Sequence, residues 1–149
     1  MGNMQKKKNK AFATSNKYDN LQNVYWTIVG ISNPGNKIPE FIQGLWDTGC
    51  TITTISKKVA DALGLPVICK EKCNTAGGSI ECNRHMVDIF LLNRLVVHNV
   101  VIMSNPILAV DCLVGTDIII HGDFSVSNFD GKTTVSFRMP SQEDVDYAK

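Results

Sequence analysis

The sequence predicts an all-β protein with a single folded domain, on three observations. Six segments are rich in β-branched and aromatic residues or alternate apolar with polar residues, as strands do; they span residues 23–32, 41–49, 51–56, 86–92, 95–103 and 133–139. Turn-forming Asn, Pro, Gly and Asp residues separate these segments, at 33–39, 76–79, 92–94, 104–106 and 129–132. At 149 residues, the chain can bury one core and is shorter than chains that usually divide into domains.

The charge pattern predicts a flexible basic N-terminal arm over residues 1–22, a folded domain over 23–140 and an acidic tail over 141–149. The first 20 residues contain five lysines and one acid, which is typical of a solvated terminus. Over the whole chain, 15 basic and 14 acidic residues leave a net charge of +1, which argues against a dedicated nucleic-acid binder.

The apolar stretches are too short for a membrane span. Polar residues such as Arg94 and His98 interrupt them well before the roughly 18 apolar residues that a spanning helix needs. The N-terminus also lacks the apolar core of an export signal. We therefore expect a cytoplasmic protein that binds neither membranes nor nucleic acids.

Two short helices are expected among the strands. Ser56 is suited to be the N-cap of a helix that starts at residue 57 and stops at Gly64. A second helix, of at most two turns, is expected within residues 115–124. Its N-cap would be Thr116 or Asp117, and it would end at Gly122.

A hairpin is expected around Gly77-Gly78. A two-residue loop there would pair Ala76 with Ser79, would place Cys73 opposite Cys82, and would set His85 opposite Lys70. Directly opposed cysteines lie within disulfide range, about 4.5 to 5.5 Å between their Cα atoms. This register motivates the hypothesis of a redox-sensitive Cys73–Cys82 cross-link.

No metal or other cofactor is expected. The five cysteines are an odd number in a chain without an export signal, so reduced thiols are the default. The spacing of Cys69, Cys73, Cys82 and His85 matches no standard zinc pattern.

Asp47 stands between an apolar segment and Thr48-Gly49, with no basic residue nearby in sequence. An isolated carboxylate among apolar side chains is costly, so it usually pairs, changes its pKa or serves chemistry. An Asp in a turn also routinely accepts hydrogen bonds from the backbone that follows it. Asp47 alone leaves both interpretations open.

Three motifs in a fixed order favour chemistry. Leu45-Trp46-Asp47-Thr48-Gly49, the glycine hairpin Thr75-Ala76-Gly77-Gly78-Ser79 and the late Leu113-Val114-Gly115 occur one after another. In this, the sequence resembles the retropepsin-like aspartic proteases over about residues 24–139. It looks like a bacterial or cellular member of that family and not like a viral one.

The resemblance implies a single-lobe, closed β-barrel with a flap hairpin, active as a two-fold homodimer. Peptide hydrolysis by this route needs two carboxylates that share a proton. The chain has one Asp-Thr-Gly, so two copies of Asp47 must meet at the dimer axis. The family assigns catalysis to Asp47, to Thr48, whose hydroxyl would bridge the two loops, and to Gly49.

The resemblance also implies an extended peptide as the substrate. Its main chain would be bound by the flap and by the loop after Asp47. The residues expected to contact it are Cys50, Thr51, Thr75, Ala76, Gly77, Gly78 and Ser79.

The sequence departs from the family pattern beside the catalytic motif. Cys50 stands where Ala or Ser is usual, and Thr51 and Ile52 stand where viral relatives carry acids that hold the substrate backbone and an arginine. That arginine is missing too, since Thr116-Asp117 follows Gly115; we interpret Asp117 as a helix cap. These departures keep an alternative open: a catalytically silent, dimeric peptide-binding module with the same fold.

Overall fold

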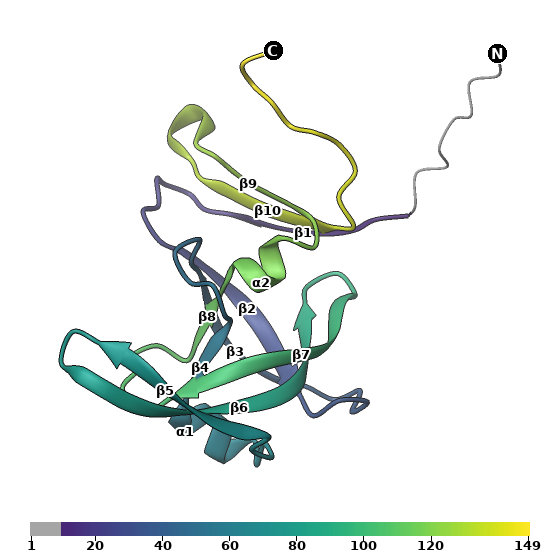
Figure 1. Ribbon diagram of the computed structural model, residues 1–149. Coiled ribbons are helices and arrows are strands. Elements are labelled where there is room, and N and C mark those ends of the chain that lie inside the picture. Colours follow the sequence, from purple (N-terminus) through teal and green to yellow (C-terminus); the bar gives the residue numbers. More distant parts are fainter. Residues whose placement is uncertain (1–9) are drawn as a thin grey trace, which may run out of the picture.

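The computed structural model describes residues 10–149 and consists of a β-barrel with a smaller sheet packed at one end (Figure 1). Six strands form the barrel in the order β2-β3-β8-β4-β7-β6, and pairing of β2 with β6 closes it. Their bounds are β2 Tyr25–Ser32, β3 Glu40–Trp46, β4 Thr54–Ser56, β6 Gly78–Leu91, β7 Leu95–Asn105 and β8 Cys112–Val114. The predicted closed, all-β barrel is confirmed.

β6 is long enough to build a hairpin outside the barrel wall. Residues 78–82 pair with β5 (Cys69–Thr75) alone, whereas the rest of β6 also pairs with β7 or β2. We call β5, the turn at 76–77 and residues 78–82 the flap hairpin.

The hairpin register differs from the predicted one by two residues. Thr75 pairs with Gly78, Cys73 with Ile80, and Lys70 with Asn83. The loop is therefore Ala76-Gly77, because Gly78 opens β6 with φ +117°, a conformation that glycine adopts readily. The predicted pairings of Cys73 with Cys82, Ala76 with Ser79 and Lys70 with His85 are wrong.

The smaller sheet joins the two ends of the described chain. It consists of β1 (Phe12–Lys17), β10 (Thr134–Met139) and β9 (Asp123–Ser127), in that order, and the short 3-10 helix η1 (Phe129–Gly131) connects β9 to β10. The predicted boundary at residue 23 is thus too late, because β1 belongs to the folded part. Among its side chains only Thr14 is buried, so the segment carries almost no apolar periodicity. The first nine residues of the predicted arm lie outside the described residues.

Both expected helices are present, and one of the two expected caps is confirmed. α1 (Lys57–Ala62) starts after Ser56, whose hydroxyl accepts the Val59 amide at 3.2 Å. α2 (Thr116–Ile119) starts after Gly115, so neither Thr116 nor Asp117 is its N-cap. None of the helices within residues 10–149 is long and apolar enough to cross a membrane.

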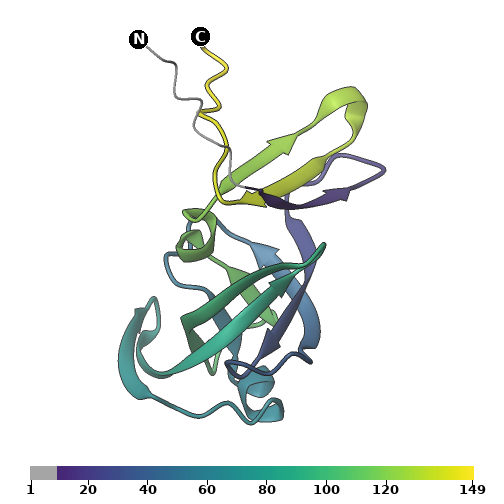
Figure 2. The ribbon, with the colours of Figure 1, turned by 90° about the vertical axis from the view of Figure 1, so that its right-hand side faces the viewer.

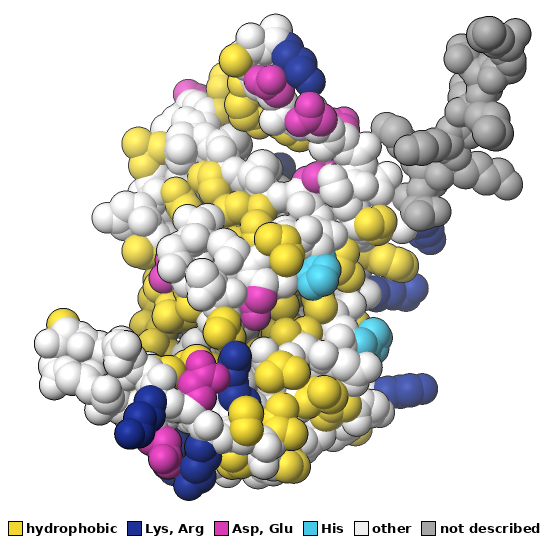
Figure 3. Space-filling view, viewed as in Figure 1, with side chains coloured by type: hydrophobic (Ala, Val, Ile, Leu, Met, Phe, Trp, Pro, Cys, Tyr) yellow, Lys and Arg dark blue, Asp and Glu magenta, His cyan; other side chains and the backbone are white. Residues whose placement is uncertain are grey.

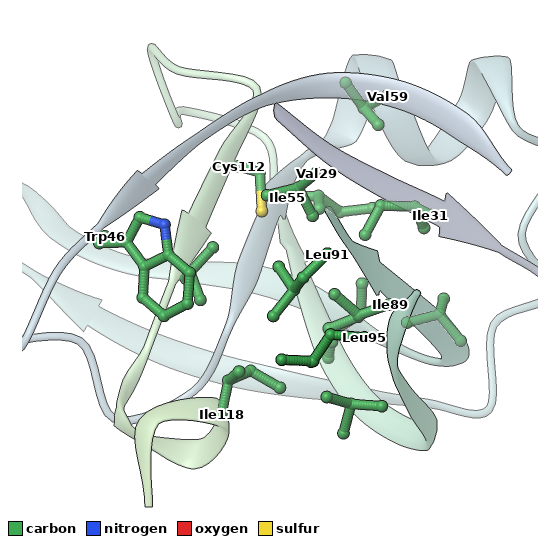
Figure 4. Packing of buried hydrophobic residues seen from close by; sticks show 14 of the residues in the cluster. Val29, Ile31, Trp46, Ile55, Val59, Ile89, Leu91, Leu95, Cys112 and Ile118 are labelled. Atoms are coloured by element: carbon green, nitrogen blue, oxygen red, sulfur yellow. The ribbon is translucent and has the colours of Figure 1, made fainter. Parts of the chain in front are cut away.

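The core fills the barrel (Figure 4). It extends to the smaller sheet through Phe137 of β10. Fully buried aliphatic side chains from the barrel strands and α2 meet inside, among them Val29, Ile31, Ile55, Ile89 and Ile118. Trp46 lies at the junction. Its ring stacks on Phe124 of β9 with a centroid distance of 5.2 Å and contacts Phe137 of β10 at 5.4 Å. The residue just before Asp47 therefore anchors the smaller sheet to the barrel.

Candidate active site

Asp47 lies at the end of β3, where this strand runs parallel to β8. Trp46 pairs with Val114, and the Asp47 amide extends the pairing by donating to the Val114 carbonyl at 3.0 Å. Asp47 itself is half-buried. The sheet thus fixes the backbone of the acid and leaves its side chain within reach of solvent.

The Asp47 carboxylate accepts one hydrogen bond within the described residues, from the Gly49 amide to Oδ1 at 2.8 Å. The Cys50 amide donates to the Asp47 carbonyl at 3.1 Å and closes the turn. No basic side chain of residues 10–149 forms an ion pair with Asp47. Asp47 therefore accepts a hydrogen bond from the backbone that follows it, as the turn interpretation predicts, while Oδ2 has no hydrogen-bond partner within residues 10–149.

We call residues 47–53 the Asp47 loop; it rests on the start of α2. The Thr116 amide and hydroxyl both donate to the Cys50 carbonyl, at 2.8 and 3.3 Å. At Gly115 a Cβ atom would lie 2.6 Å from the same carbonyl oxygen. Only glycine permits so close an approach, which explains the glycine of the late motif in physical terms.

Two residues that were not predicted to belong to the site, Asp117 and Thr53, complete this support. Asp117 accepts hydrogen bonds from Thr53, whose side chain is fully buried. Thr53 is one of several hydroxyl residues in 51–56, so nothing in the sequence distinguishes it. Because acids are common at helix starts, Asp117 was interpreted as a helix cap and not as a partner of the Asp47 loop.

Cys50 has a protonated, partly covered thiol. Burial raises its pKa above the ordinary value, with a smaller contribution from the nearby Asp47 and Asp117 carboxylates. The thiol donates to the Ile52 carbonyl at 2.9 Å. The side chain that departs from the family pattern is therefore a neutral one beside Asp47.

The other predicted site residues fall into two groups. Thr48, Gly49 and Thr51 are exposed on the Asp47 loop, and residues 75–79 form the tip of the flap hairpin. In Figure 2 the loop and the hairpin both lie on the left-hand side of the barrel. No hydrogen bond joins them within residues 10–149.

The flap hairpin has two chemically different faces. Figure 3 shows basic and acidic side chains gathered over β5 and β6, where Lys70 pairs with Glu81 at 3.3 Å. On the opposite face Cys73 and Ile80 are half-buried, and the Cys73 thiol lies 3.4 Å from the Met103 sulfur of β7. The Lys70–Glu81 face is turned outward. The other face packs on β7 through Cys73, and it also carries Glu71, which forms an ion pair with Arg84 at 2.9 Å.

All five cysteines are free thiols. Cys73 and Cys82 are diagonal neighbours on one face of the hairpin instead of a directly opposed pair. Burial, and then the Cys73 thiol, raise the pKa of Cys82 to about 12. His85 is buried, with its ring nitrogens 2.9 Å from the Pro66 carbonyl and 2.8 Å from the Ser104 hydroxyl. Within the described chain, no three His, Cys, Asp or Glu side chains are grouped as metal ligands.

Comparisons with known proteins agree with this geometry. A family model described as aspartyl protease matches residues 37–118, more than half of the chain. A retropepsin-like aspartic protease from Rickettsia conorii matches with a TM-score of 0.58 and 13% identity, over 87% of this chain and 96% of that one. The EIAV protease in complex with the inhibitor HBY-793 matches with a TM-score of 0.50 and 23% identity, over 67% and 88%. No curated protein sequence matches.

The structural matches identify the fold. The bacterial and the viral protein both match it over two thirds or more of this chain. Together with the family model, the ordered motifs and the closed barrel, they lead to one assignment. The chain belongs to the aspartyl protease family and has the retropepsin-like fold.

Proposed function

We propose that this protein is an aspartic endopeptidase that works as a homodimer, with one Asp47 from each subunit. The observation that carries the proposal is the state of Asp47. Its backbone is fixed by β8, one carboxylate oxygen takes a backbone hydrogen bond, and the other has no partner within the described residues. A second carboxylate placed beside it would complete a pair that shares one proton.

In the proposed mechanism the two Asp47 carboxylates divide the work. The ionised one accepts a proton from a water molecule as that water attacks the peptide carbonyl carbon. The protonated one donates a hydrogen bond to the carbonyl oxygen, where negative charge develops. The C–N bond of the tetrahedral intermediate then breaks, and the carboxyl that took the proton from water passes it to the leaving nitrogen. The products are a carboxylic acid and an amine, and the pair again shares one proton. The Gly49 amide, 2.8 Å from Oδ1, keeps the carboxylate oriented throughout.

The neighbouring residues have supporting roles in this proposal. The exposed Thr48 would bond its hydroxyl to the loop of the other subunit across the two-fold axis, and Gly49 leaves room for the substrate. The flap tip, residues 75–79, would close over an extended peptide and pair with its main chain. Cys50 and Thr51 would contact the peptide beside the scissile bond. No metal or cofactor takes part.

Incubation of the purified protein with a diverse peptide pool, from acidic to neutral pH, tests the proposal. The unmodified protein is expected to cleave peptides, and Asp47→Asn to lower the rate by at least about a thousandfold, because an amide cannot accept the proton. Asp111→Asn, at an exposed acid outside the loop, is the matched control and should cleave normally.

Two outcomes would contradict the proposal. Cleavage that survives Asp47→Asn would exclude the mechanism. Peptide binding by the unmodified protein without cleavage at any pH would instead favour the silent dimeric peptide-binding module. Peptide binding measured on Asp47→Asn separates recognition from chemistry in either case.

A further inference from the structure

The contact between Asp117 and Thr53 is the most specific interaction of the Asp47 loop. Asp117 accepts the Thr53 amide on Oδ2 at 2.9 Å and the Thr53 hydroxyl on Oδ1 at 2.7 Å. Oδ1 also lies 3.0 Å from the Ile118 amide. Both carboxylate oxygens are thus used, three donors point at them, and no salt bridge reaches Asp117 within residues 10–149.

The Thr53 hydroxyl links Asp117 to the backbone of Gly115. While it donates to Asp117, it accepts the Gly115 amide at 3.0 Å. The Thr53 carbonyl accepts the Met103 amide at 3.1 Å, so this residue is held on three sides. Thr53 is completely buried, and water cannot replace a partner that is lost there.

Residues 114–117 form hydrogen bonds with the Asp47 loop at three points. The Val114 carbonyl accepts the Asp47 amide, the Thr116 amide donates to the Cys50 carbonyl, and the Asp117 carboxylate accepts the Thr53 amide. Among these contacts, only that of Asp117 uses a charged group, and hydrogen bonds to charged groups are stronger than neutral ones. Loss of the carboxylate would therefore loosen the far end of the loop most.

We propose that Asp117 is a positioning residue whose ionised carboxylate clamps Thr53 and so holds the Asp47 loop in its working shape. Every partner in this clamp belongs to one subunit, so the loop is ordered before the second copy arrives. This chain has Thr51 and Ile52 where viral relatives carry acids, and Thr116 where they carry an arginine. The Asp117–Thr53 contact is therefore present in a chain that lacks those charged groups. The link to catalysis rests on the proposed endopeptidase function; the clamp itself does not.

Cys50 provides a test that does not depend on activity. Its thiol sits inside the loop, half-buried and bonded to the Ile52 carbonyl, so iodoacetamide should modify it slowly in the unmodified protein. Asp117→Asn keeps the shape of the side chain but removes one acceptor and the charge. It is expected to speed Cys50 alkylation, read on the loop peptide by mass spectrometry, by about tenfold or more, mainly through local opening. Loss of the Asp117 charge adds a smaller increase in thiolate, and Thr53→Val, which keeps that charge, measures the opening alone.

Thr53 variants show whether the effect runs through the clamp. Thr53→Val removes the hydroxyl and should act like Asp117→Asn, whereas Thr53→Ser keeps it and should react like the unmodified protein. The double variant Asp117→Asn/Thr53→Val should be no worse than Thr53→Val alone, because both substitutions break the Asp117 contact and Thr53→Val already removes the acceptor of the Gly115 amide as well. Asp111→Asn is the matched acid control. If circular dichroism shows Asp117→Asn to be unfolded, Thr53→Val becomes the test variant, since it leaves Asp117 two backbone donors.

Activity adds a second, separable result. With peptide cleavage as the readout, Asp117→Asn should lower kcat by about tenfold or more and change KM little, because it disturbs the loop and not the flap. Unchanged Cys50 alkylation in Asp117→Asn, or additive effects in the double variant, would overturn the clamp. If no variant cleaves any peptide while alkylation follows the expected pattern, the clamp stands and the endopeptidase proposal fails.

Discussion

The five cysteines show how strongly the surroundings of a single residue set its chemistry. Cys69 is exposed on β5, whereas Cys112 of β8 is completely buried between β3 and β4. Burial raises the pKa of Cys112 to about 12, and burial together with Cys73 does the same for Cys82. Since the thiolate is the reactive form, thiols of equal intrinsic chemistry become unequal nucleophiles.

The expected order of alkylation at pH 8 in the folded protein follows from these environments. Cys69 should react first, Cys73 and Cys50 more slowly, and Cys82 and Cys112 only when the protein unfolds. Mass spectrometry of peptides after timed iodoacetamide treatment measures the order. Denaturation in urea is the control, since all five rates should then converge. Rapid labelling of Cys112 in the folded protein would show that this thiol is accessible and would contradict the expected order.

At the scale of elements, Asp123 joins β9 to the end of β10 and to the tail that follows. It accepts hydrogen bonds from the Ser141 hydroxyl, the Gln142 amide and Arg138 Nε, the last at 2.7 Å. The bonds from Ser141 and Gln142 are the main reason that the pKa of Asp123 falls to about 2, and Arg138 lowers it further. The predicted tail over 141–149 is therefore attached at its first two residues.

A lowered pKa gives Asp123 a defined effect on stability. The group is ionised above its ordinary value of 3.8 in both states, and its bonds then stabilise the fold in full. Between pH 4 and pH 2 the unfolded chain binds the proton first, so this contribution is lost as the pH falls. In Asp123→Asn the contribution should be absent at every pH.

Melting temperatures at pH 6, 4, 3 and 2 measure the effect. The unmodified protein should melt higher than Asp123→Asn at pH 6, and the difference should shrink toward pH 2. Asp19→Asn is the control, because Asp19 is exposed and has no side-chain hydrogen bond within residues 10–149. A difference that stays constant from pH 6 to pH 2 would show that the charge of Asp123 does not stabilise the fold.

Most elements could be predicted from the sequence, and the errors have physical causes. Alternation and turn residues indicated the barrel strands, and the Ser56 cap indicated α1. The predicted hairpin register is wrong because Gly77 and Gly78 each suit a tight turn, so the sequence alone does not show that Gly78 opens β6. β1 was missed because backbone pairing with β10 holds it, and such pairing leaves little trace in side-chain periodicity.

Some polar residues could not be predicted because their partners are distant in sequence. Asp88 stands within an apolar strand segment, yet it is buried and accepts the Gly35 amide at 3.0 Å and the Asn99 amide at 2.9 Å. The same holds for Asp117 and Thr53, which are 64 residues apart. By contrast, Asp47 could be found, because its motif is local and occurs in order with two others.

The whole molecule must be a dimer if the proposed function is right, since one chain supplies one Asp47. Specific activity should therefore fall on dilution once the enzyme concentration drops below the dimer dissociation constant, approaching about tenfold per tenfold dilution. Cleavage rates over a wide range of enzyme concentration, with sedimentation at the same concentrations, measure this.

Mixed subunits give an independent check. An excess of Asp47→Asn should suppress the activity of the unmodified protein, because most active-site aspartates then face an asparagine. Bovine serum albumin at the same concentration is the control for non-specific effects. Undiminished activity in a tenfold excess of Asp47→Asn would show that one chain works alone.

The smaller sheet also sets an order for folding during synthesis. Ser15 of β1 and Ser136 of β10 lie side by side although they are 121 residues apart in the chain. All barrel strands have left the ribosome once residue 114 has emerged, whereas β1 gains its neighbour only when the last strand follows. The barrel can form first, and the indole of Trp46 is covered by Phe137 only after β10 has emerged.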